Sequence, residues 1–447
     1  MGIYTITRKG FHEGTGVNLA GTIALPSSKS ISNRVLLIRT LSPIPFEVEN
    51  LSEADDTMLM QQLLNQIETA TPPVSIDCRN AGTVMRFLTA YLSLKPGSWL
   101  LTGSTRMQQR PIGILVEALR SLGASIEYEG TPGYPPLRIS GKELKGGAVT
   151  VDVSISSQFV SALLMIAPLL PEGLTISMTG EQVSSPYVEM TTGIMKEFGI
   201  VTERKEESIM VHPGRYTAKR LTGGRYSVEA DWSSAAFWYE AAALSGSANI
   251  TLPGLRKNSL QGDSVLAKLF RPLGVETTFE GEGVKLICEQ SACRNTKYEI
   301  RNSVPASIQE SPFAAMDLKA FPDLALPLIV SYAALGIPAR FTGLHHLKVK
   351  ESDRLHAIVT ELERCHISIG NPASGIIETA AYPLPGSSLS SALPVTIETY
   401  GDHRIAMAFA LLAIKTGTIR MSDPSVVSKS YPGFWEEMRR LGFEIAK

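Results

Sequence analysis

The sequence has few cysteines, no long apolar run and almost no net charge. The four cysteines, Cys78, Cys288, Cys293 and Cys365, include no CxxC pair and are too sparse for a disulfide framework, so we expect structural thiols. No stretch of about 18 uninterrupted apolar residues occurs, and the N-terminal segment lacks the apolar region of a signal peptide. These absences predict a cytoplasmic protein without a membrane partner.

A net charge of −1 argues against nucleic-acid binding through bulk electrostatics, so any anion has to be held by local clusters. HExxH, zinc-type Cys/His spacings, a Walker loop, GxGxxG and GxSxG are all missing. We therefore predict no bound metal, no ATP hydrolysis, no dinucleotide chemistry and no α/β-hydrolase chemistry. A chain of 447 residues, 44% hydrophobic and 19% charged, is typical of a globular protein of two or three domains.

One kind of segment recurs along the chain: a small polar opening followed by an apolar helix rich in alanine or leucine. The six copies begin at Ser28, Asn80, Ser156, Asp231, Phe321 and Gly401. An amphipathic helix follows most of them, often ending in Leu-Gly or Phe-Gly before a β-rich stretch. The pattern predicts a large α/β or α+β protein made of repeated units, with the first helix of each unit buried and the second facing solvent on one side.

The polar openings contain more chemistry than a helix cap needs. In LPSSKSISNR, a serine suffices as the cap, whereas Lys29 and Arg34 lie at a helix start, where the helix dipole favours anions. Backbone N–H groups, hydroxyls and cations together favour a phosphate or carboxylate site. Other helix starts add Gly82, Arg86, Arg106, Arg110, Ser156, Ser157, Gln158, Lys348, Lys350, Glu351, Asp353, Arg354, Asp402, His403, Arg404 and Lys429.

Together, these residues predict a pocket for two anionic substrates, with Asp323, Glu351 and His403 as candidate proton carriers. Each segment alone also has a plainer explanation. The first helix start can be a capped helix with solvated charges, the segment with the Lys350–Asp353 pair a solvated charge run, and His403 a satisfied buried histidine.

Several blocks in combination resemble the 3-phosphoshikimate 1-carboxyvinyltransferase family, also called 5-enolpyruvylshikimate-3-phosphate (EPSP) synthases. In chain order they are LPSSKSISNR, NAGTVMR, LTGSTRMQQRPIG, SSQF with ALLMIAPL, VSSPYVE, FPDLAL, LKVKESDRL, GDHRIAMAFAL and VSKSYPGF. The resemblance implies an inside-out α/β barrel of two domains, each made of three βαβαββ units. It places one domain at residues 25–230 and the other at 1–24 with 231–447, with hinges near 24–26 and 229–232.

The resemblance also implies the reaction: the enolpyruvyl group of phosphoenolpyruvate is transferred to the 5-hydroxyl of shikimate 3-phosphate, and phosphate is released. It implies a monomer in the shikimate pathway to aromatic amino acids, with neither metal nor organic cofactor. Asp323 is expected to accept the 5-hydroxyl proton, and Glu351, assisted by Lys29, to protonate the methylene carbon. The residues expected to contact shikimate 3-phosphate are Lys29, Ser30, Arg34, Ser156, Ser157, Gln158, Ser184, Tyr187, Asp323, His346 and Lys350. Those expected to contact phosphoenolpyruvate are Lys29, Gly82, Arg110, Gln158, Arg354, His403, Arg404 and Lys429.

Four residues depart from the family pattern. Ser27 replaces a glycine, Gln109 a glutamate, Phe87 a proline and His346 an asparagine. Phe87 lies near the phosphoenolpyruvate end of the expected site, so we predict nothing about sensitivity to the inhibitor glyphosate. A histidine can still donate a hydrogen bond to the shikimate ring, but its titration makes that contact pH-dependent.

Two other functions compete with this one. UDP-N-acetylglucosamine enolpyruvyl transferase shares the fold and the donor, but that family has a Lys-Asn pair near its N-terminus and a reactive cysteine in the region of Arg110. Here Lys29 precedes Ser30, and the loop Arg106–Pro111 has no cysteine. The other alternative is a non-catalytic anion-binding protein. The residues that argue against it are Lys29, Asp323, Glu351 and His403.

Overall fold

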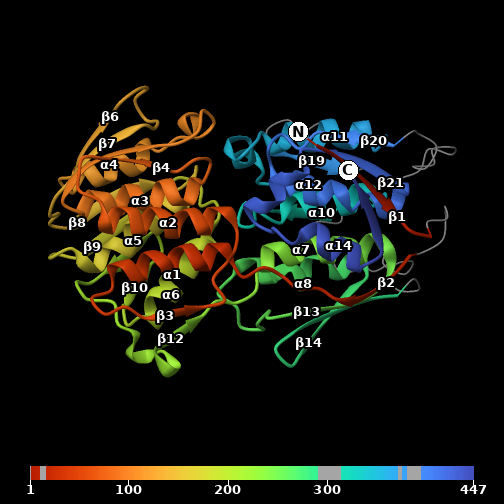
Figure 1. Ribbon diagram of the computed structural model, residues 1–447, viewed down its shortest axis with the longest axis horizontal. Coiled ribbons are helices and arrows are strands. Elements are labelled where there is room, and N and C mark those ends of the chain that lie inside the picture. The colour runs from red at the N-terminus through yellow and green to blue at the C-terminus, as the bar shows by residue number, and fades with distance from the viewer. Residues whose placement is uncertain (1, 11–16, 290–313, 371–374, 380–393) are drawn as a thin grey trace. The chain divides into compact units, whose positions relative to one another are not determined.

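The computed structural model describes residues 2–10, 17–289, 314–370, 375–379 and 394–447 (Figure 1). The chain forms two compact units: unit 1, Met1–Pro26 with Glu229–Lys447, and unit 2, Ser27–Val228. Within unit 1, the two passages of the chain are joined by a 2.8 Å hydrogen bond from the Asp231 N–H to the Pro26 carbonyl. Unit 2 is therefore an insertion into unit 1.

The described residues of unit 1 form three four-stranded sheets with one common topology. In each sheet the first two strands are parallel and the remaining pairs antiparallel, in the orders β2-β13-β15-β14, β16-β17-β19-β18 and β20-β21-β1-β22. The strands are β1 (Ile3–Arg8), β2 (Val17–Thr22), β13 (Gly246–Pro253), β14 (Val275–Glu280), β15 (Gly283–Cys288), β16 (Ala314–Asp317), β17 (Ala339–Thr342), β18 (Ile369–Gly370), β19 (Ile377–Thr379), β20 (Val395–Ile397), β21 (Thr418–Ser422) and β22 (Phe443–Ala446). The N-terminal strand β1 thus lies between β21 and β22, two strands from the C-terminal end of the chain.

Two sheets of unit 2 repeat this topology, in the orders β4-β5-β7-β6 and β8-β9-β11-β10. The third sheet, within the described residues, is reduced to the parallel pair β12 and β3, in which Tyr226 lies opposite Val48. The strands are β3 (Glu47–Glu49), β4 (Val74–Asp77), β5 (Gly97–Thr102), β6 (Ser125–Tyr128), β7 (Leu137–Gly141), β8 (Gly147–Asp152), β9 (Leu174–Thr179), β10 (Thr202–Lys205), β11 (Ser208–Val211) and β12 (Arg225–Ser227).

All six apolar segments predicted as buried first helices are helical. They are α1 (Lys29–Leu41), α3 (Gly82–Leu94), α5 (Gln158–Ile166), α7 (Trp232–Ser245), α10 (Ala325–Ala334) and α12 (His403–Ala410). Every residue of α7, α10 and α12 is buried, which confirms the prediction most clearly in unit 1.

The amphipathic second helices are α2 (Asp55–Thr69), α4 (Gly113–Ser121), α6 (Ser185–Glu197), α11 (Arg354–Arg364) and α14 (Phe434–Arg440). The segment GDSVLAKLFRPLG, which has the Leu-Gly ending of the expected amphipathic helices, is instead three short pieces: η5 (Gly262–Val265), α8 (Leu266–Leu269) and η6 (Arg271–Leu273). Pro272 provides no backbone N–H, so it interrupts the helical hydrogen bonds there. Helix α2 was not predicted. It ends at Thr69, with Ala70 as its C-cap, and lacks the Leu-Gly or Phe-Gly ending that follows α4, α6 and α14.

The helices lie inside each unit and the sheets outside. In unit 1 the helices α7, α10 and α12 contact one another, as do α1, α3 and α5 in unit 2. The strands alternate between buried and exposed residues, as in β8, where Val149 and Val151 are buried and their neighbours exposed. Such alternation is typical of a sheet with one face on the core and one in water. This arrangement explains why the apolar helices tolerate no polar face.

The cysteines fit the prediction of structural thiols. Cys78, Cys288 and Cys365 are buried, and burial raises the pKa of Cys78 and raises that of Cys365 to about 12. Cys293 lies outside the described residues.

One buried acid stands out in the core of unit 1. Glu240 lies within α7 with 0% of its surface exposed, and neither carboxyl oxygen has a hydrogen-bond partner among the described residues. Burial raises the pKa of Glu240 well above its ordinary value of 4.5. The folded protein therefore carries Glu240 as a neutral acid, whereas the unfolded chain ionises it at neutral pH.

We expect Glu240→Gln to stabilise the protein by an amount that grows with pH. Below pH 4.5 the proton is bound in both states, but above it folding requires uptake of a proton, which costs about 1.4 kcal/mol per pH unit up to the raised pKa. Glutamine has a similar shape and needs no proton. Urea denaturation should show equal stability near pH 4 and a more stable variant at pH 8. Glu276→Gln on the exposed side of β14 is the control and should show no such gain; a pH-independent difference for Glu240→Gln would contradict the assignment.

Candidate active site

Two serines at the start of α1, Ser28 before it and Ser32 in its first turn, have distinct roles. Ser28 is the N-cap, and its side-chain oxygen accepts a hydrogen bond from the Ile31 N–H at 3.4 Å. Ser32 accepts one from the Ser52 N–H at 3.1 Å. These two hydroxyls therefore serve the backbone. Gln109 and Ser27, which depart from the family pattern, lie at the end of η1 (Met107–Gln109) and just before the cap.

Lys29, the first residue of α1, has a buried partner. Its Nζ lies 3.2 Å from Oδ2 of Asp56 in the first turn of α2, and the two side chains are only 16% and 9% exposed. The predicted cation is thus held in place by a carboxylate that the sequence motifs did not identify.

Gly82, at the start of α3, lies against two guanidinium groups. A Cβ added to Gly82 would lie 2.6 Å from Nη1 of Arg86 and 2.6 Å from Nη1 of Arg110, so the two cations are immediate neighbours. Arg86 and Arg110 are 4% and 6% exposed. Two adjacent, buried positive charges beside a position without a side chain are well suited to hold an anion. The sequence analysis names Arg86 among the cations at helix starts, but the family resemblance does not assign it to either substrate.

The start of α5 is tied to the same place. Gln158 accepts a hydrogen bond from Nη1 of Arg86 at 3.1 Å and donates one to the Thr83 hydroxyl at 3.1 Å. The Ser156 side chain accepts a hydrogen bond from the Gln158 N–H at 3.2 Å, and Ser157 is the N-cap residue. The N-terminal ends of α3 and α5 therefore meet, and Gly82, Arg110 and Gln158 lie close together around Arg86.

Arg34 is held by the protein itself. Its Nε donates to the Thr191 hydroxyl at 2.7 Å and Nη1 to the Ser30 carbonyl at 2.8 Å. Nη2 donates to the Ser161 hydroxyl and, at 3.3 Å, to the Tyr187 carbonyl. Burial lowers the pKa of Arg34 to about 10, partly offset by Tyr187, so the group stays charged at neutral pH. Arg34 thus fixes α1 to α5 and α6, and Phe87 lies under its guanidinium.

Ser184 marks the start of α6. It adopts a left-handed conformation with φ of 57° and is 4% exposed. A left-handed conformation is uncommon for a residue with a side chain, and such positions are enriched at functional sites. Its carbonyl accepts the Tyr187 N–H at 3.1 Å, so both predicted residues occupy one turn.

In unit 1, Arg354 is the centre of a carboxylate cluster. Its Nε donates to Oδ2 of Asp402 at 2.8 Å, its Nη2 to Oε2 of Glu351 at 3.0 Å, and its Nη1 lies 3.5 Å from Oδ1 of Asp323. Its side chain is 1% exposed. Burial lowers the pKa of Arg354, but Asp402, Glu351 and Asp323 outweigh burial, so the pKa is raised.

The other two predicted cations join the same carboxylates. Nη2 of Arg404 lies 2.9 Å from Oδ2 of Asp323, and Nζ of Lys429 lies 3.3 Å from Oε1 of Glu351. Arg404 also donates to the Ser233 hydroxyl at 3.1 Å. The starts of α7 and α12 and the residues before α10 therefore meet at one point. Unit 1 brings together the predicted residues Asp323, Glu351, Arg354, Arg404 and Lys429.

Asp402 is the buried carboxylate that holds Arg354 in this cluster. It is 0% exposed, caps α12 by accepting the Arg404 N–H at 3.0 Å, and accepts a hydrogen bond from the Ser352 hydroxyl at 3.1 Å. Nδ1 of the adjacent His403 lies 3.7 Å from Oδ1 of Asp402. The residue was recognisable in the motif GDHR but was not assigned a role, because a helix cap explains an aspartate at that position.

His346 is a buried histidine close to this cluster. It lies in η8 (His345–Val349), is 3% exposed, and neither ring nitrogen has a hydrogen-bond partner among the described residues. Burial lowers the pKa of His346 to about 3, assisted by Lys350 and other nearby cations. His346 is therefore neutral at physiological pH in this structure, which argues against a pH-dependent contact. Lys350 follows η8 directly.

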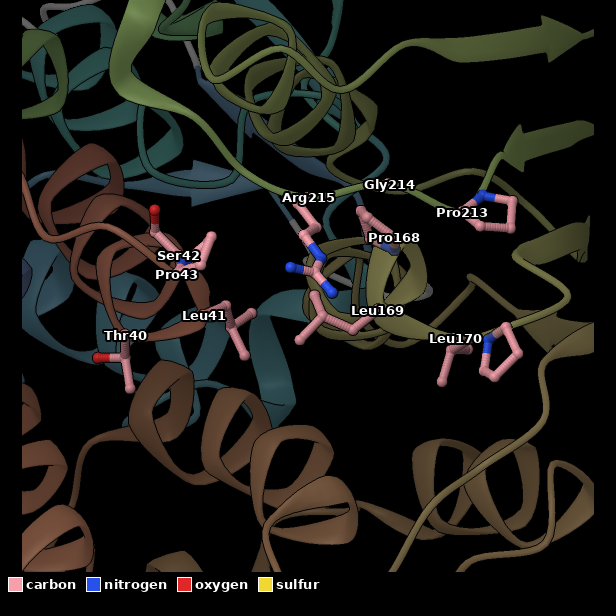
Figure 2. Close-up of a pocket in the computed structure, with 11 residues that line it drawn as sticks. Thr40, Leu41, Ser42, Pro43, Pro168, Leu169, Leu170, Pro213, Gly214 and Arg215 are labelled. Atoms are coloured by element: carbon pink, nitrogen blue, oxygen red, sulfur yellow. The ribbon is translucent and has the colours of Figure 1, made fainter.

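A cavity of about 650 Å³ in unit 2 lies at the C-terminal end of α1 (Figure 2). It is lined by Thr40–Pro43, Pro168–Pro171 and Pro213–Arg215. The first segment is the C-terminal end of α1, and the second contains the turn η2 (Ala167–Leu169). The C-terminal end of a helix has a partial negative charge, so Arg215 is favourable there without an anionic ligand. We therefore do not assign this cavity to the site.

Known proteins identify the family. The model of the EPSP synthase family, 3-phosphoshikimate 1-carboxyvinyltransferase, matches residues 14–71 and 64–438. The chain belongs to the EPSP synthase family. It is 44% identical over 428 residues to the 3-phosphoshikimate 1-carboxyvinyltransferase of Bacteroides fragilis (strain YCH46), covering 96% of each chain. It is 35% identical over 436 residues to that of Marinomonas sp. (strain MWYL1), covering 93% of this chain and 95% of the relative.

Solved structures confirm the fold class of this EPSP synthase family member. An EPSP synthase from Acinetobacter baumannii superposes with a TM-score of 0.73 over 100% of both chains, at 21% sequence identity. A second structure of EPSP synthase from that organism gives 0.72 at 20% identity. In the part of the chain that the structure describes, no helix is long and apolar enough to span a membrane, and no group of His, Cys, Asp and Glu side chains could hold a metal ion.

Asp402→Asn should lower the free energy of unfolding by about 3 kcal/mol, because it leaves the buried Arg354 with less negative charge around it while keeping the shape of the cap. Urea denaturation measures the loss. The matched control is Asp353→Asn, the same substitution at the exposed N-cap of α11. Asparagine and aspartate cap helices about equally well, so the control should be nearly neutral; equal losses for both variants would show that the charge of Asp402 is unimportant.

Proposed function

We propose that this chain catalyses the reaction for which its family is named. The enolpyruvyl (1-carboxyvinyl) group of phosphoenolpyruvate is transferred to the 5-hydroxyl of shikimate 3-phosphate, and phosphate is released. The observation that carries the residue roles is the cluster in unit 1 in which Arg354, Arg404 and Lys429 lie around Glu351 and Asp323. It combines cations for an anionic substrate with two carboxylates that can move protons.

We assign phosphoenolpyruvate to Arg354, His403, Arg404 and Lys429 in unit 1. Guanidinium groups match the geometry of phosphate and carboxylate oxygens, and an ammonium adds a compact charge. The residues of unit 2 assigned to the same substrate are Lys29, Gly82, Arg110 and Gln158, and Arg86 joins them because it lies against Gly82.

We assign shikimate 3-phosphate mainly to hydroxyl, amide and cationic groups of unit 2. These are Lys29, Ser30, Arg34, Ser156, Ser157, Gln158, Ser184 and Tyr187. Asp323, His346 and Lys350 of unit 1 are assigned to the ring hydroxyls. The neutral state of His346 supports a hydrogen bond that does not change with pH.

The two carboxylates divide the proton transfers. Glu351 protonates the methylene carbon, with assistance from Lys29, and the adjacent carbon becomes cationic. The 5-hydroxyl oxygen attacks that carbon as Asp323 removes its proton, which gives a tetrahedral intermediate. Loss of a proton from the new methyl group then expels phosphate. Acid–base and electrostatic stabilisation of this kind contribute several kcal/mol each, on the order of 10²-fold to 10⁴-fold in rate.

As part of the same proposal, the enzyme acts in the cytoplasm as a monomer on its two small substrates, without nucleic acid, metal or organic cofactor. Its net charge of −1 argues against nucleic acid as a partner.

Phosphate release tests the function directly. Phosphoenolpyruvate with shikimate 3-phosphate should release phosphate, whereas UDP-N-acetylglucosamine as acceptor should not. Asp323→Asn should lower kcat by about 10²-fold to 10⁴-fold, because it removes the proton acceptor. Phosphate release only with the UDP sugar would favour the rival UDP-N-acetylglucosamine enolpyruvyl transferase. Full turnover by Asp323→Asn would show that Asp323 is not the proton acceptor.

Gly82→Ala tests the anion site of unit 2. The added methyl group would meet both guanidinium groups at 2.6 Å and force them apart, so we expect KM for phosphoenolpyruvate to rise about tenfold with a smaller change in kcat. Steady-state kinetics measures both constants. Gly130→Ala is the control: its added Cβ would meet only Pro136, at 3.8 Å, and the kinetics should not change. An unchanged KM for Gly82→Ala would remove Gly82 from the site.

A further inference from the structure

The guanidinium group of Arg34 is held by uncharged acceptors of unit 2. Nε donates to the Thr191 hydroxyl at 2.7 Å, and Nη1 donates to the Ser30 carbonyl at 2.8 Å. Nη2 donates to the Ser161 hydroxyl at 3.2 Å and to the Tyr187 carbonyl at 3.3 Å. Four of the five N–H donors of the group therefore have acceptors in the part of the chain that the structure describes.

These bonds fix the direction of the guanidinium group without compensating its charge. Arg34 is 2% exposed, and no carboxylate among the described residues forms an ion pair with it. Arg354, by contrast, is paired with Asp402 and Glu351. A buried cation without a carboxylate is costly, so an anion that binds beside Arg34 meets a positive charge that is already oriented and not yet neutralised.

Thr191 of α6 supplies the shortest of the four bonds. It is 0% exposed, and its Oγ1 also lies 2.7 Å from the Tyr187 carbonyl and 2.8 Å from the Ser161 hydroxyl. A hydroxyl has one hydrogen, so it donates to one of these two oxygens while a lone pair accepts from Nε. Because Ser161 belongs to α5 and Tyr187 to α6, two helices fix the oxygen at which Nε is directed.

A hydrogen bond from a threonine hydroxyl to the carbonyl four residues earlier is ordinary in a helix and has a purely structural explanation. Thr89 in α3 makes such a bond to the Met85 carbonyl at 2.8 Å, and it is equally buried at 0% exposure. Thr191 differs from Thr89 in accepting a hydrogen bond from a guanidinium group as well. The contact with Arg34 is therefore what Thr191 adds beyond the structure of its own helix.

Two aromatic rings restrain the centre of the same guanidinium group. Cζ of Arg34 lies 5.5 Å from the ring centroid of Phe87 and 6.0 Å from that of Tyr187. Such contacts are attractive but leave the N–H groups free to turn about the centre. The directions of the N–H groups are therefore set by the hydrogen bonds, with Thr191 at Nε.

We propose that Thr191 is a positioning residue for shikimate 3-phosphate: its hydroxyl sets the orientation in which Arg34 presents its charge to that substrate. Thr191 acts through Arg34 and is itself assigned to neither substrate. This inference rests on the proposed function, because that function assigns Arg34 to shikimate 3-phosphate. Phosphoenolpyruvate is assigned to residues other than Arg34, so the effect of Thr191 is confined to one substrate.

Thr191→Val tests the inference, because valine keeps the branched shape and removes the hydroxyl. Isothermal titration calorimetry of shikimate 3-phosphate into the full-length protein, without phosphoenolpyruvate, measures the Kd. We expect Thr191→Val to raise this Kd about tenfold, the size of effect that one hydrogen bond to a charged group has. Thr191→Ser keeps the hydroxyl and should bind within about twofold of the wild type.

Thr89→Val is the matched control, because it removes a hydroxyl that is equally buried and makes the same bond within its helix. Urea denaturation should show similar losses of stability for the two valine variants, whereas the Kd of Thr89→Val should not change. In steady-state kinetics, Thr191→Val should raise KM for shikimate 3-phosphate about tenfold and leave KM for phosphoenolpyruvate and kcat within about twofold. An equal rise in both KM values would indicate general distortion and would overturn the inference.

A double-mutant cycle separates positioning from packing. In an Arg34→Gln background no guanidinium group remains to be oriented, so adding Thr191→Val should change the Kd less than about twofold. A further tenfold rise in that background would overturn the inference. Should Thr191→Val not fold, Ser161→Ala takes its place, because Ser161 contacts both Thr191 and Nη2 of Arg34. It should raise the Kd about threefold, and an unchanged value would contradict the inference.

Three other results would also overturn the inference: an unchanged Kd for folded Thr191→Val, failure of Thr191→Ser to retain binding, or an equal rise for Thr89→Val. Phosphate release by the wild type, measured in parallel, separates the two proposals. Release together with an unchanged Kd for Thr191→Val refutes the inference alone, whereas no release by the wild type refutes the proposed function.

Discussion

Buried positive charge at the starts of helices is the constraint on which the rest of this structure depends. Arg354 and Arg404 are 1% and 4% exposed, at positions where the helix dipole already adds positive potential. Removing such charges from water costs several kcal/mol per ion unless partners compensate. The carboxylates of Asp402, Asp323 and Glu351 provide that compensation in unit 1, and Asp56 provides it for Lys29 in unit 2.

The fold creates the constraint because it places apolar helices inside and sheets outside. Three helices contact one another in each unit, so the polar residues at their N-terminal ends lie close together. In unit 1 this juxtaposition is visible as the bond from Arg404 to Ser233 and the pair of Arg404 with Asp323. Asp231, which caps α7 in the same place, illustrates the balance: burial raises its pKa, and the nearby Arg404 and the serine hydroxyls partly oppose that effect. The helix caps and the charged residues assigned to the substrates thus belong to one hydrogen-bonded network.

The sequence predicted the parts of this arrangement that depend on local pattern. Each apolar helix has a recognisable polar start, and the motifs named most of the residues that the structure gathers within each unit. The resemblance also implied domain boundaries near residues 24–26 and 229–232. Along the chain, the boundaries between the two compact units fall between residues 26 and 27 and between residues 228 and 229. The division into two domains with hinges at these positions remains a proposal.

The partners of the charges could not be predicted, because they are chosen by tertiary packing. Nothing in the spacing of Lys29 and Asp56 distinguishes that pair from other nearby charges, and Asp402 has a sufficient local explanation as a cap. The strands β3 and β12 have three residues each, too few for an alternating pattern to show. The neutral state of His346 depends on burial among cations, which no motif encodes.

The same carboxylates that make the arginines tolerable in the fold are also the groups assigned to move protons. A base or acid that is paired with two cations is held in its ionised form, which suits Asp323 as a proton acceptor but opposes the role of Glu351 as a donor. The fold therefore uses the charges of Asp323 and Glu351 twice, once to compensate the buried Arg354 and once for the proposed chemistry, so that a substitution at either carboxylate changes the surroundings of Arg354 as well as the proton transfer.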